Sequence, residues 1–168
     1  MRGQRVSQRK TASAKGKDDG EQVVASNRKA RHDYEIVDRY ECGIVLTGDE
    51  VKSLRGGRAS LVDAFARVNV SEVWLEGMHI PPYEQGNIKT HEPLRPRKLL
   101  LHRRQIQELA GATQERGYSL VPLRVYFTHG VAKVELAVAR GKRRHEKRQA
   151  IAEREAEREM EQAAARRR

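Results

Sequence analysis

Two neighbouring segments late in the chain alternate apolar and polar residues, and this alternation constrains the fold more than any other feature. Successive side chains of a strand point to opposite faces, so residues 120–127 and 131–140 are each expected to form a strand with one apolar face. The apolar positions are Val121, Leu123, Val125 and Phe127 in the first segment and Val134, Leu136 and Val138 in the second. Thr128, His129 and Gly130 lie between the two segments and predict a tight hairpin turn. The chain is therefore expected to contain an antiparallel β-domain that ends near residue 140.

Three earlier segments, residues 34–46, 60–70 and 72–80, are rich in aromatic and β-branched residues and are also expected to be strands. Trp74 alternates with the apolar residues of its segment, which places it on the face opposite the core. Gly43 lies inside the first of these strands and indicates a bulge or a sharp bend.

Short helices are expected between the strands. Thr47 and Glu50 have the spacing of a capping box, which predicts the start of a helix of about two turns. A second helix is predicted from Arg103 to Ala110, with Gly111 as an interruption and Thr113 as a new cap.

About six antiparallel strands with short helices, in roughly 110 residues, favour a small closed or nearly closed β-barrel of the oligonucleotide-binding (OB) type. The expected organisation is a disordered basic tail over residues 1–26, this barrel over residues 27–140, and a charged tail over residues 141–168. The last segment has good helix formers but no apolar stripe, since Ile151 and Met160 are its only large apolar residues. It is therefore expected to be disordered in the free protein and helical when bound to a partner.

The charge of the chain points to an anionic partner. Its 34 Lys and Arg residues outnumber its 23 Asp and Glu residues and give a net charge of +11, which favours nucleic acid or an anionic membrane surface. A membrane is the weaker alternative, because no segment approaches the roughly 20 apolar residues of a spanning helix. The basic N-terminal segment lacks the apolar core of a secretory signal. The single cysteine, Cys42, allows no internal disulfide. These features together predict a cytoplasmic protein.

No pattern in the sequence indicates catalysis. Gly141 and Lys142 lack the remaining residues of a phosphate-binding loop, and the six histidines have no metal-ligand spacing. Ser53 and Ser60 have no nucleophile context, and Asp49 with Glu50 is typical of helix capping. We therefore expect no catalytic residue, no metal and no cofactor.

The basic segment 139–148 joins the predicted barrel to the charged tail. Its cationic side chains can neutralise phosphates and release counterions, which makes affinity depend on salt. His145 could stack on an exposed base. Two carboxylates, Glu41 and Glu146, are unusual in a polyanion-binding protein. From the residues alone they are either acceptors for base amino groups or ordinary salt-bridge partners.

Five motifs in this order resemble the family of the bacterial SsrA-binding protein, small protein B. They are Asn27–Tyr34 (NRKARHDY), Gly48–Arg55 (GDEVKSLR), Pro82–Gly86 (PYEQG), Arg97–Leu101 (RKLLL) and Gly141–Arg148 (GKRRHEKR). The resemblance implies an OB-type barrel that holds the elbow of the transfer-RNA-like domain of transfer-messenger RNA. It also implies an adaptor, with no enzymatic activity, that delivers this RNA to the vacant A site of a stalled ribosome for tagging of the nascent chain (trans-translation).

The family resemblance also implies two groups of contact residues. Those implied for transfer-messenger RNA are Arg31, Tyr34, Glu41, Arg97, Lys98, Leu100, His102, Lys142 and Arg143. Those implied for the small-subunit decoding centre and the messenger channel are Arg144, His145, Glu146, Lys147, Arg148 and Ile151. The sequence departs from the family pattern at His102, often Asn, and at Glu146, commonly Asp. The protein is expected to be a monomer. The alternative function is an RNA-processing enzyme or a general OB-type RNA chaperone.

Overall fold

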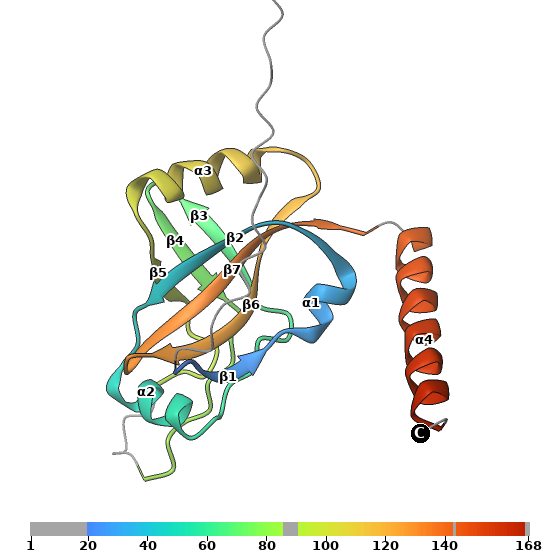
Figure 1. The fold of residues 1–168 in the computed structure, drawn as a ribbon. Helices are drawn as coiled ribbons and strands as arrows, with labels where there is room; N and C mark the ends of the chain where they lie inside the picture. Colours follow the sequence, from blue (N-terminus) through green and yellow to red (C-terminus); the bar gives the residue numbers. More distant parts are fainter. Residues whose placement is uncertain (1–19, 86–90, 143, 167–168) are drawn as a thin grey trace, which may run out of the picture.

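A computed structural model describes residues 20–85, 91–142 and 144–166 (Figure 1). The strands are β1 (Gln22–Ser26), β2 (Tyr34–Ile44), β3 (Phe65–Asn69), β4 (Glu72–Glu76), β5 (Arg97–Leu100), β6 (Tyr118–Thr128) and β7 (Val131–Gly141). The helices are α1 (Arg28–Asp33), α2 (Gly48–Arg55), α3 (Arg103–Gln114) and α4 (Arg144–Arg166).

The seven strands of the described residues form one antiparallel sheet. The order is β1-β6-β3-β4-β5-β2-β7, and β7 pairs in turn with β6, so the pairings of the other six strands close on themselves. The expected hairpin is confirmed, with pairing from Tyr118↔Arg140 to Thr128↔Val131. Its turn contains two residues with positive φ, His129 at 48° and Gly130 at 75°. The β2–β7 and β6–β7 ladders are the longest in the sheet, and their three strands lie side by side (Figure 1).

The folded unit begins earlier than residue 27, which corrects the predicted limit of the N-terminal tail. Residues 22–26 form β1, which pairs with the end of β6 from Gln22↔Phe127 to Ser26↔Arg124. Local composition gives little sign of this strand, because its hydrogen-bond partners lie about a hundred residues away along the chain. Residues 1–19, which make up most of the predicted disordered tail, lie outside the described residues.

Two predicted strands are shorter than expected. The segments 60–70 and 72–80 contribute only β3 and β4 to the regular sheet. Asp63 has a left-handed φ of 61°, and Gly77 has a φ of 75°. A Cβ at Gly77 would lie 2.9 Å from the Asp63 carbonyl oxygen, so the two segments cross here with space only for glycine.

Helix α3 runs through Gly111 without a break, so the predicted interruption is wrong. Thr113 starts no new turn, because its hydroxyl donates to the carbonyl oxygens of Leu109 and Ala110, both at 3.1 Å. This is the back-bonding of a threonine inside a helix. Leu109 is fully buried and fixes the helix against the sheet.

The main core lies within the closed set of strands and includes Val125 and Phe127. Val121 and Leu123 instead pack in a second buried cluster with Ala30 of α1, because the register shift between Pro122 and Arg124 turns them to the other face of β6, so the expectation of one apolar face for residues 120–127 is wrong.

Val73 and Leu75 are fully buried whereas Trp74 between them is partly exposed, as the alternation predicted. Cys42 is fully buried, and burial, with the nearby Glu41 charge, raises the pKa of its thiol to about 12. The register shift of β2 lies between Ile36 and Asp38, so a bulge is not at Gly43, and the alternative of a bend there stays a prediction.

Helix α4 extends away from the sheet next to α1 (Figure 1). Its described side chains are exposed, including Ile151 at 39% and Met160 at 68%, in agreement with the missing apolar stripe. The prediction that this segment orders only on binding stays a prediction. No helix of the described residues is long and apolar enough to cross a membrane.

Candidate nucleic-acid interface

A groove between β2, β5 and the start of α3 brings together three residues that the family resemblance implied as RNA contacts. Glu41, Leu100 and His102 line it, and it has a volume of about 460 Å³. The remaining lining residues are Gly43, Leu101, Gln105 and Lys133. The groove therefore combines an apolar side chain, an imidazole ring, a carboxylate and an amine.

The position of Leu100 in this groove follows from the strand pairing. Leu100 pairs with Gly43 at the end of β5, and a Cβ at Gly43 would lie 3.2 Å from the Leu100 Cβ. Glycine at position 43 thus lets β5 place Leu100 close against β2. Leu99 points into the core, and the strand alternation turns Leu100 outward, where 52% of it is exposed. An exposed leucine on a rigid strand can pack against a ribose or a base.

His102 is exposed at the N-terminus of α3. Its backbone amide donates to the side-chain oxygen of Gln105 at 3.1 Å, and this contact fixes the backbone where the ring begins. Its side chain is exposed. The imidazole is therefore free to stack on a base or to bond one.

The Glu41 carboxylate is held from one side by the hydroxyl of Tyr126. That hydroxyl donates to Glu41 Oε2 at 2.6 Å, and Lys133 Nζ lies 3.9 Å from Glu41 Oε1. The lysine is at the outer limit of an ion pair, and the Glu41 side chain is 56% exposed. Glu41 is therefore partly a salt-bridge partner and partly an open acceptor, so both interpretations from the sequence apply.

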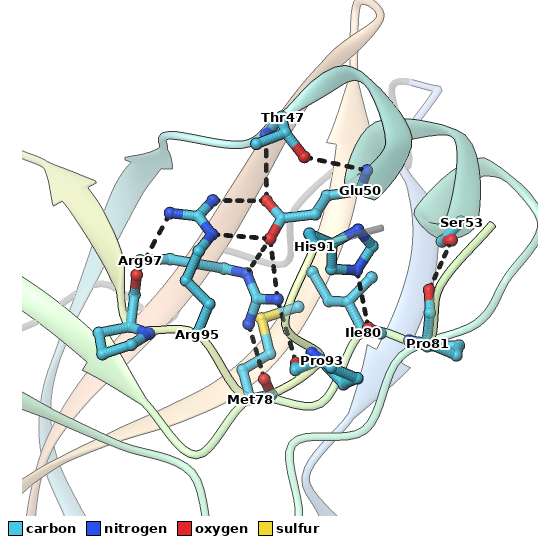
Figure 2. A network of polar contacts seen from close by, with 11 residues as sticks. Thr47, Glu50, Ser53, Met78, Ile80, Pro81, His91, Pro93, Arg95 and Arg97 are labelled. Carbon is cyan, nitrogen blue, oxygen red and sulfur yellow. Dashed lines mark hydrogen bonds and ion pairs between the residues drawn. The ribbon is translucent and has the colours of Figure 1, made fainter. Parts of the chain in front are cut away.

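Arg97 cannot be an RNA contact in this structure, which corrects the residue set that the resemblance implied. Its side chain is fully buried, and its guanidinium donates to Glu50 at 3.0 Å, to the Met78 carbonyl oxygen at 2.7 Å and to that of Pro93 at 3.1 Å (Figure 2). Arg95 donates to the same carboxylate at 2.7 Å. A phosphate could reach Arg97 only by displacing these partners.

Glu50 has a larger role than the predicted cap. The capping box with Thr47 is present, and the same Glu50 carboxylate also accepts hydrogen bonds from Arg95 and Arg97 (Figure 2). Burial alone would raise the pKa of Glu50, but hydrogen bonds from Arg95, the Thr47 amide and Arg97 lower it below its usual value. Burial lowers the pKa of Arg97, and the hydrogen bond and charge of Glu50 oppose this effect. The network anchors β5 three residues before Leu100.

Lys98 points outward but is already paired. Its ammonium lies 2.9 Å from a Glu72 oxygen, and the Trp74 indole donates to the other oxygen of that carboxylate at 3.1 Å. Hydrogen bonds from Lys98 and Trp74 lower the pKa of Glu72. Lys98 is partly exposed, so it can contact a phosphate only by sharing or leaving this carboxylate.

The other predicted contacts lie at the opposite end of β2. Arg31 is exposed on α1, and Tyr34 starts the strand. The backbone amide of Lys142 donates to the Asp33 carbonyl oxygen at 2.9 Å, which attaches the end of β7 to the end of α1. Tyr34 and Glu41 are seven residues apart, about 20 Å along a strand. The structure thus separates the sequence-predicted set into two places.

A second, larger groove lies next to α1 and was not found from the sequence. It has a volume of about 630 Å³ and is lined in part by Lys29, Tyr34, Phe65, Arg67 and Tyr118. Phe65 is 46% exposed there. The only sequence signal for this site was Tyr34, because the other residues come from β3, β6 and α1 and meet only in the fold.

The tail residues have a helical backbone from Arg144 onward. Arg143 lies outside the described residues, as do the side chains of residues 144–147, namely Arg144, His145, Glu146 and Lys147. Arg148 is exposed. Within the described part of the chain, no group of three or more His, Cys, Asp or Glu residues could hold a metal ion.

Comparisons with known proteins agree on one family. The profile of the SmpB protein family matches residues 24–166. An SsrA-binding protein of Acidothermus cellulolyticus is 62% identical over 151 residues, covering 90% of this chain and 95% of that protein. An SsrA-binding protein of Thermobifida fusca is 59% identical over 160 residues, covering 95% and 99%.

A solved structure shares the fold as well. It is described as "tmRNA-SmpB: a journey to the center of the bacterial ribosome" and has a TM-score of 0.62 with 48% sequence identity. The similarity covers 75% of this chain and 92% of that chain.

Proposed function

This chain belongs to the SmpB protein family, and we propose that it is an RNA-binding adaptor of trans-translation. It binds the transfer-RNA-like domain of transfer-messenger RNA, the SsrA RNA, and delivers it to the vacant A site of a stalled ribosome. It acts in the cytoplasm, where ribosomes translate, and catalyses no reaction itself.

The observation that carries the RNA-binding site is the convergence of Glu41, Leu100 and His102 on one groove. Leu100 supplies an apolar contact, His102 an exposed ring and Glu41 an acceptor for a base amino group. Such a set suits unstacked bases of a folded RNA, because an intact A-form helix does not present base faces for stacking. The net charge of +11 adds attraction that does not depend on sequence.

The closed set of strand pairings is the basis for assigning an OB-type barrel. In this fold class a curved antiparallel sheet presents side chains to nucleic acid from rigid strands. Here β2 and β5 supply Glu41 and Leu100. Rigid placement lowers the ordering cost of binding and favours one RNA shape over others.

The C-terminal segment from residue 144 onward has the second task in this proposal, which is to contact the ribosome. Residues 144–148 contact the small-subunit decoding centre, and α4 enters the empty messenger channel. A helix of 23 residues is about 35 Å long at 1.5 Å per residue. Its exposed, highly charged surface suits an RNA-lined channel better than a protein core.

A truncation and a groove variant test the two tasks separately. The truncation should end at Lys142, because β7 pairs as far as Gly141 with Tyr34 and an earlier stop would damage the sheet. We expect this variant to bind the transfer-RNA-like domain within a few-fold of the full chain and to lose tagging on stalled ribosomes. Leu100→Ala should instead weaken RNA binding first, with tagging falling in proportion.

Specificity and RNA integrity separate the adaptor from the alternative functions. The full chain should prefer the transfer-RNA-like domain over a random transcript of equal length at physiological salt, and it should leave that RNA intact. Equal binding to both RNAs would indicate a general chaperone. Turnover of the RNA at substoichiometric protein would indicate an enzyme.

A further inference from the structure

Tyr126 is a buried tyrosine whose hydroxyl contacts Glu41, a residue of the groove. Only 2% of the residue is exposed, yet its hydroxyl donates to Glu41 Oε2 at 2.6 Å. Tyr126 lies on β6 and Glu41 on β2, with β7 between them, so the ring extends across a neighbouring strand to reach the carboxylate. Burial, followed by the hydrogen bond and charge of Glu41, raises the pKa of this tyrosine. The hydroxyl therefore stays a proton donor at every physiological pH.

A charged side chain fixes the tyrosine ring in turn. The Arg124 guanidinium lies 4.3 Å from the centre of the Tyr126 ring. Arg124 is itself held by Glu135 at 2.7 Å and by Glu21 at 2.7 Å. These contacts come from β6, from β7 and from the residue before β1. A cation over an aromatic face with two carboxylate partners has little freedom to move, and neither has the ring below it.

The free end of this chain of contacts is the Glu41 carboxylate. Lys133 is 3.9 Å from Oε1, too far for a hydrogen bond, so that oxygen keeps acceptor capacity toward the groove. A glutamate on an open strand surface would otherwise sample several rotamers and lose that freedom when it binds RNA. The hydrogen bond from Tyr126 already restricts the Glu41 rotamers in the free protein, so less conformational entropy is lost when RNA binds.

We propose that Tyr126 is a positioning residue for RNA recognition: through its hydroxyl it holds Glu41 in the orientation in which the carboxylate accepts a base amino group. This inference rests on the proposed function, and it assigns a role to a residue on β6 that does not line the groove. Arg124 supports the same arrangement through the ring.

Tyr126→Phe tests the proposal, because it removes only the hydroxyl and keeps the buried ring under Arg124. We expect the affinity for the transfer-RNA-like domain to fall about tenfold. This is about the contribution of the one hydrogen bond that the Glu41 carboxylate accepts from a base in this proposal. The slope of affinity against salt should not change, since no phosphate contact is lost. Binding to a random transcript of equal length should also stay the same.

Tyr40→Phe is the matched control. Tyr40 lies on β2 beside Glu41, and its hydroxyl bonds carboxylates too, those of Asp38 and Glu108, both at 3.3 Å. The control therefore removes a tyrosine–carboxylate hydrogen bond from the same strand without touching Glu41. Its RNA affinity should remain within about twofold of the original protein.

A double-mutant cycle with Glu41→Gln separates positioning from a general loss of packing. If Tyr126 acts through Glu41, adding Tyr126→Phe to Glu41→Gln should cost little further affinity. Additive losses, or a Tyr126→Phe protein that binds RNA as the original does, would overturn the inference. All four proteins should be compared well below their melting temperatures. Failure of the original protein to prefer the transfer-RNA-like domain over the random transcript would instead refute the proposed function.

Discussion

Replacing Glu50 with Gln should destabilise the protein far more than a typical surface change. Gln keeps nearly the same volume and can still serve the capping box with Thr47, so the substitution isolates the charge. In the folded protein that charge is fully buried and faces Arg97, also fully buried, and Arg95, which is 32% exposed. Without the Glu50 charge, the guanidinium of Arg97 remains in the interior with no counter-charge.

The expected size follows from the cost of breaking a buried ion pair. Removing one partner typically costs about 3–5 kcal/mol, and Gln should lie near 3 kcal/mol because its oxygen still accepts one hydrogen bond. For a chain of this length, about 3 kcal/mol lowers the melting temperature by roughly 6–12 °C. Urea unfolding followed by circular dichroism measures the free energy of unfolding, and calorimetry measures the melting temperature.

The pH dependence supplies a second measurement on Glu50. The folded pKa of its carboxyl is lowered below its usual value of 4.5, so the charge contributes stability that is fully present above about pH 4.5. That contribution is lost as the pH falls through the folded pKa, where the protonated carboxyl resembles Gln. The gap in unfolding free energy between the two proteins should therefore be full at pH 7 and should narrow below about pH 4.5.

Glu84→Gln is the control for this substitution. Glu84 pairs with Arg58 at 3.0 Å, but its side chain is 78% exposed, so the change should cost less than about 1 kcal/mol. The reasoning about the buried charge fails if Glu50→Gln stays within about 0.5 kcal/mol of the original protein at pH 7. A gap that is constant from pH 7 to pH 3 would also contradict it.

Three further predictions concern the interface. Gly43→Ala should cost about 1–3 kcal/mol of stability by crowding Leu100 and should weaken RNA binding; Gly48→Ala, where a Cβ has open space, should do neither in the same unfolding and binding assays. Replacing Lys142 and Arg143 together with Ala should flatten the salt dependence of RNA affinity by about two phosphate contacts, and an unchanged slope in a salt titration would show that neither touches a phosphate. Amides of α4 beyond its first two turns should exchange rapidly in the isolated protein and slowly on the ribosome, and strong protection in the free protein would contradict ordering on binding.

Local patterns predicted the parts of the fold that depend on neighbours in sequence. The alternation around Leu123 and Leu136 predicted the β6–β7 hairpin, and the spacing of Thr47 and Glu50 predicted the start of α2. The capping residues lie three positions apart, and the two strands of the hairpin are adjacent in sequence and joined by a short turn. The closure of the sheet includes the pairing of β3 with β6 at Ala66↔Leu120, between segments that are far apart in sequence. No local pattern contains that information.

The error over Arg97 had a signal in the sequence. Residues 97–100 alternate in burial, so Arg97 lies on the same side of β5 as the buried Leu99, and Lys98 and Leu100 point outward. The family resemblance assigned both cations to the RNA, whereas strand parity separates them. Tyr126 had no comparable signal, because it reaches Glu41 across an intervening strand.

The junction between β7 and α4 determines how far the C-terminal end of α4 can move. Gly141 is paired with Tyr34, and the next amide is bonded to Asp33, so the fixed part of the chain extends to Lys142, two residues before α4 begins. If α4 orders on binding as predicted, its 23 residues form a helix about 35 Å long, and a rotation of about 10° at its first residue moves its far end by roughly 6 Å. A small rotation at the first turn of α4 therefore displaces its C-terminal end much more than its start. In the proposed function, the sheet can therefore hold the RNA while the far end of α4 changes position.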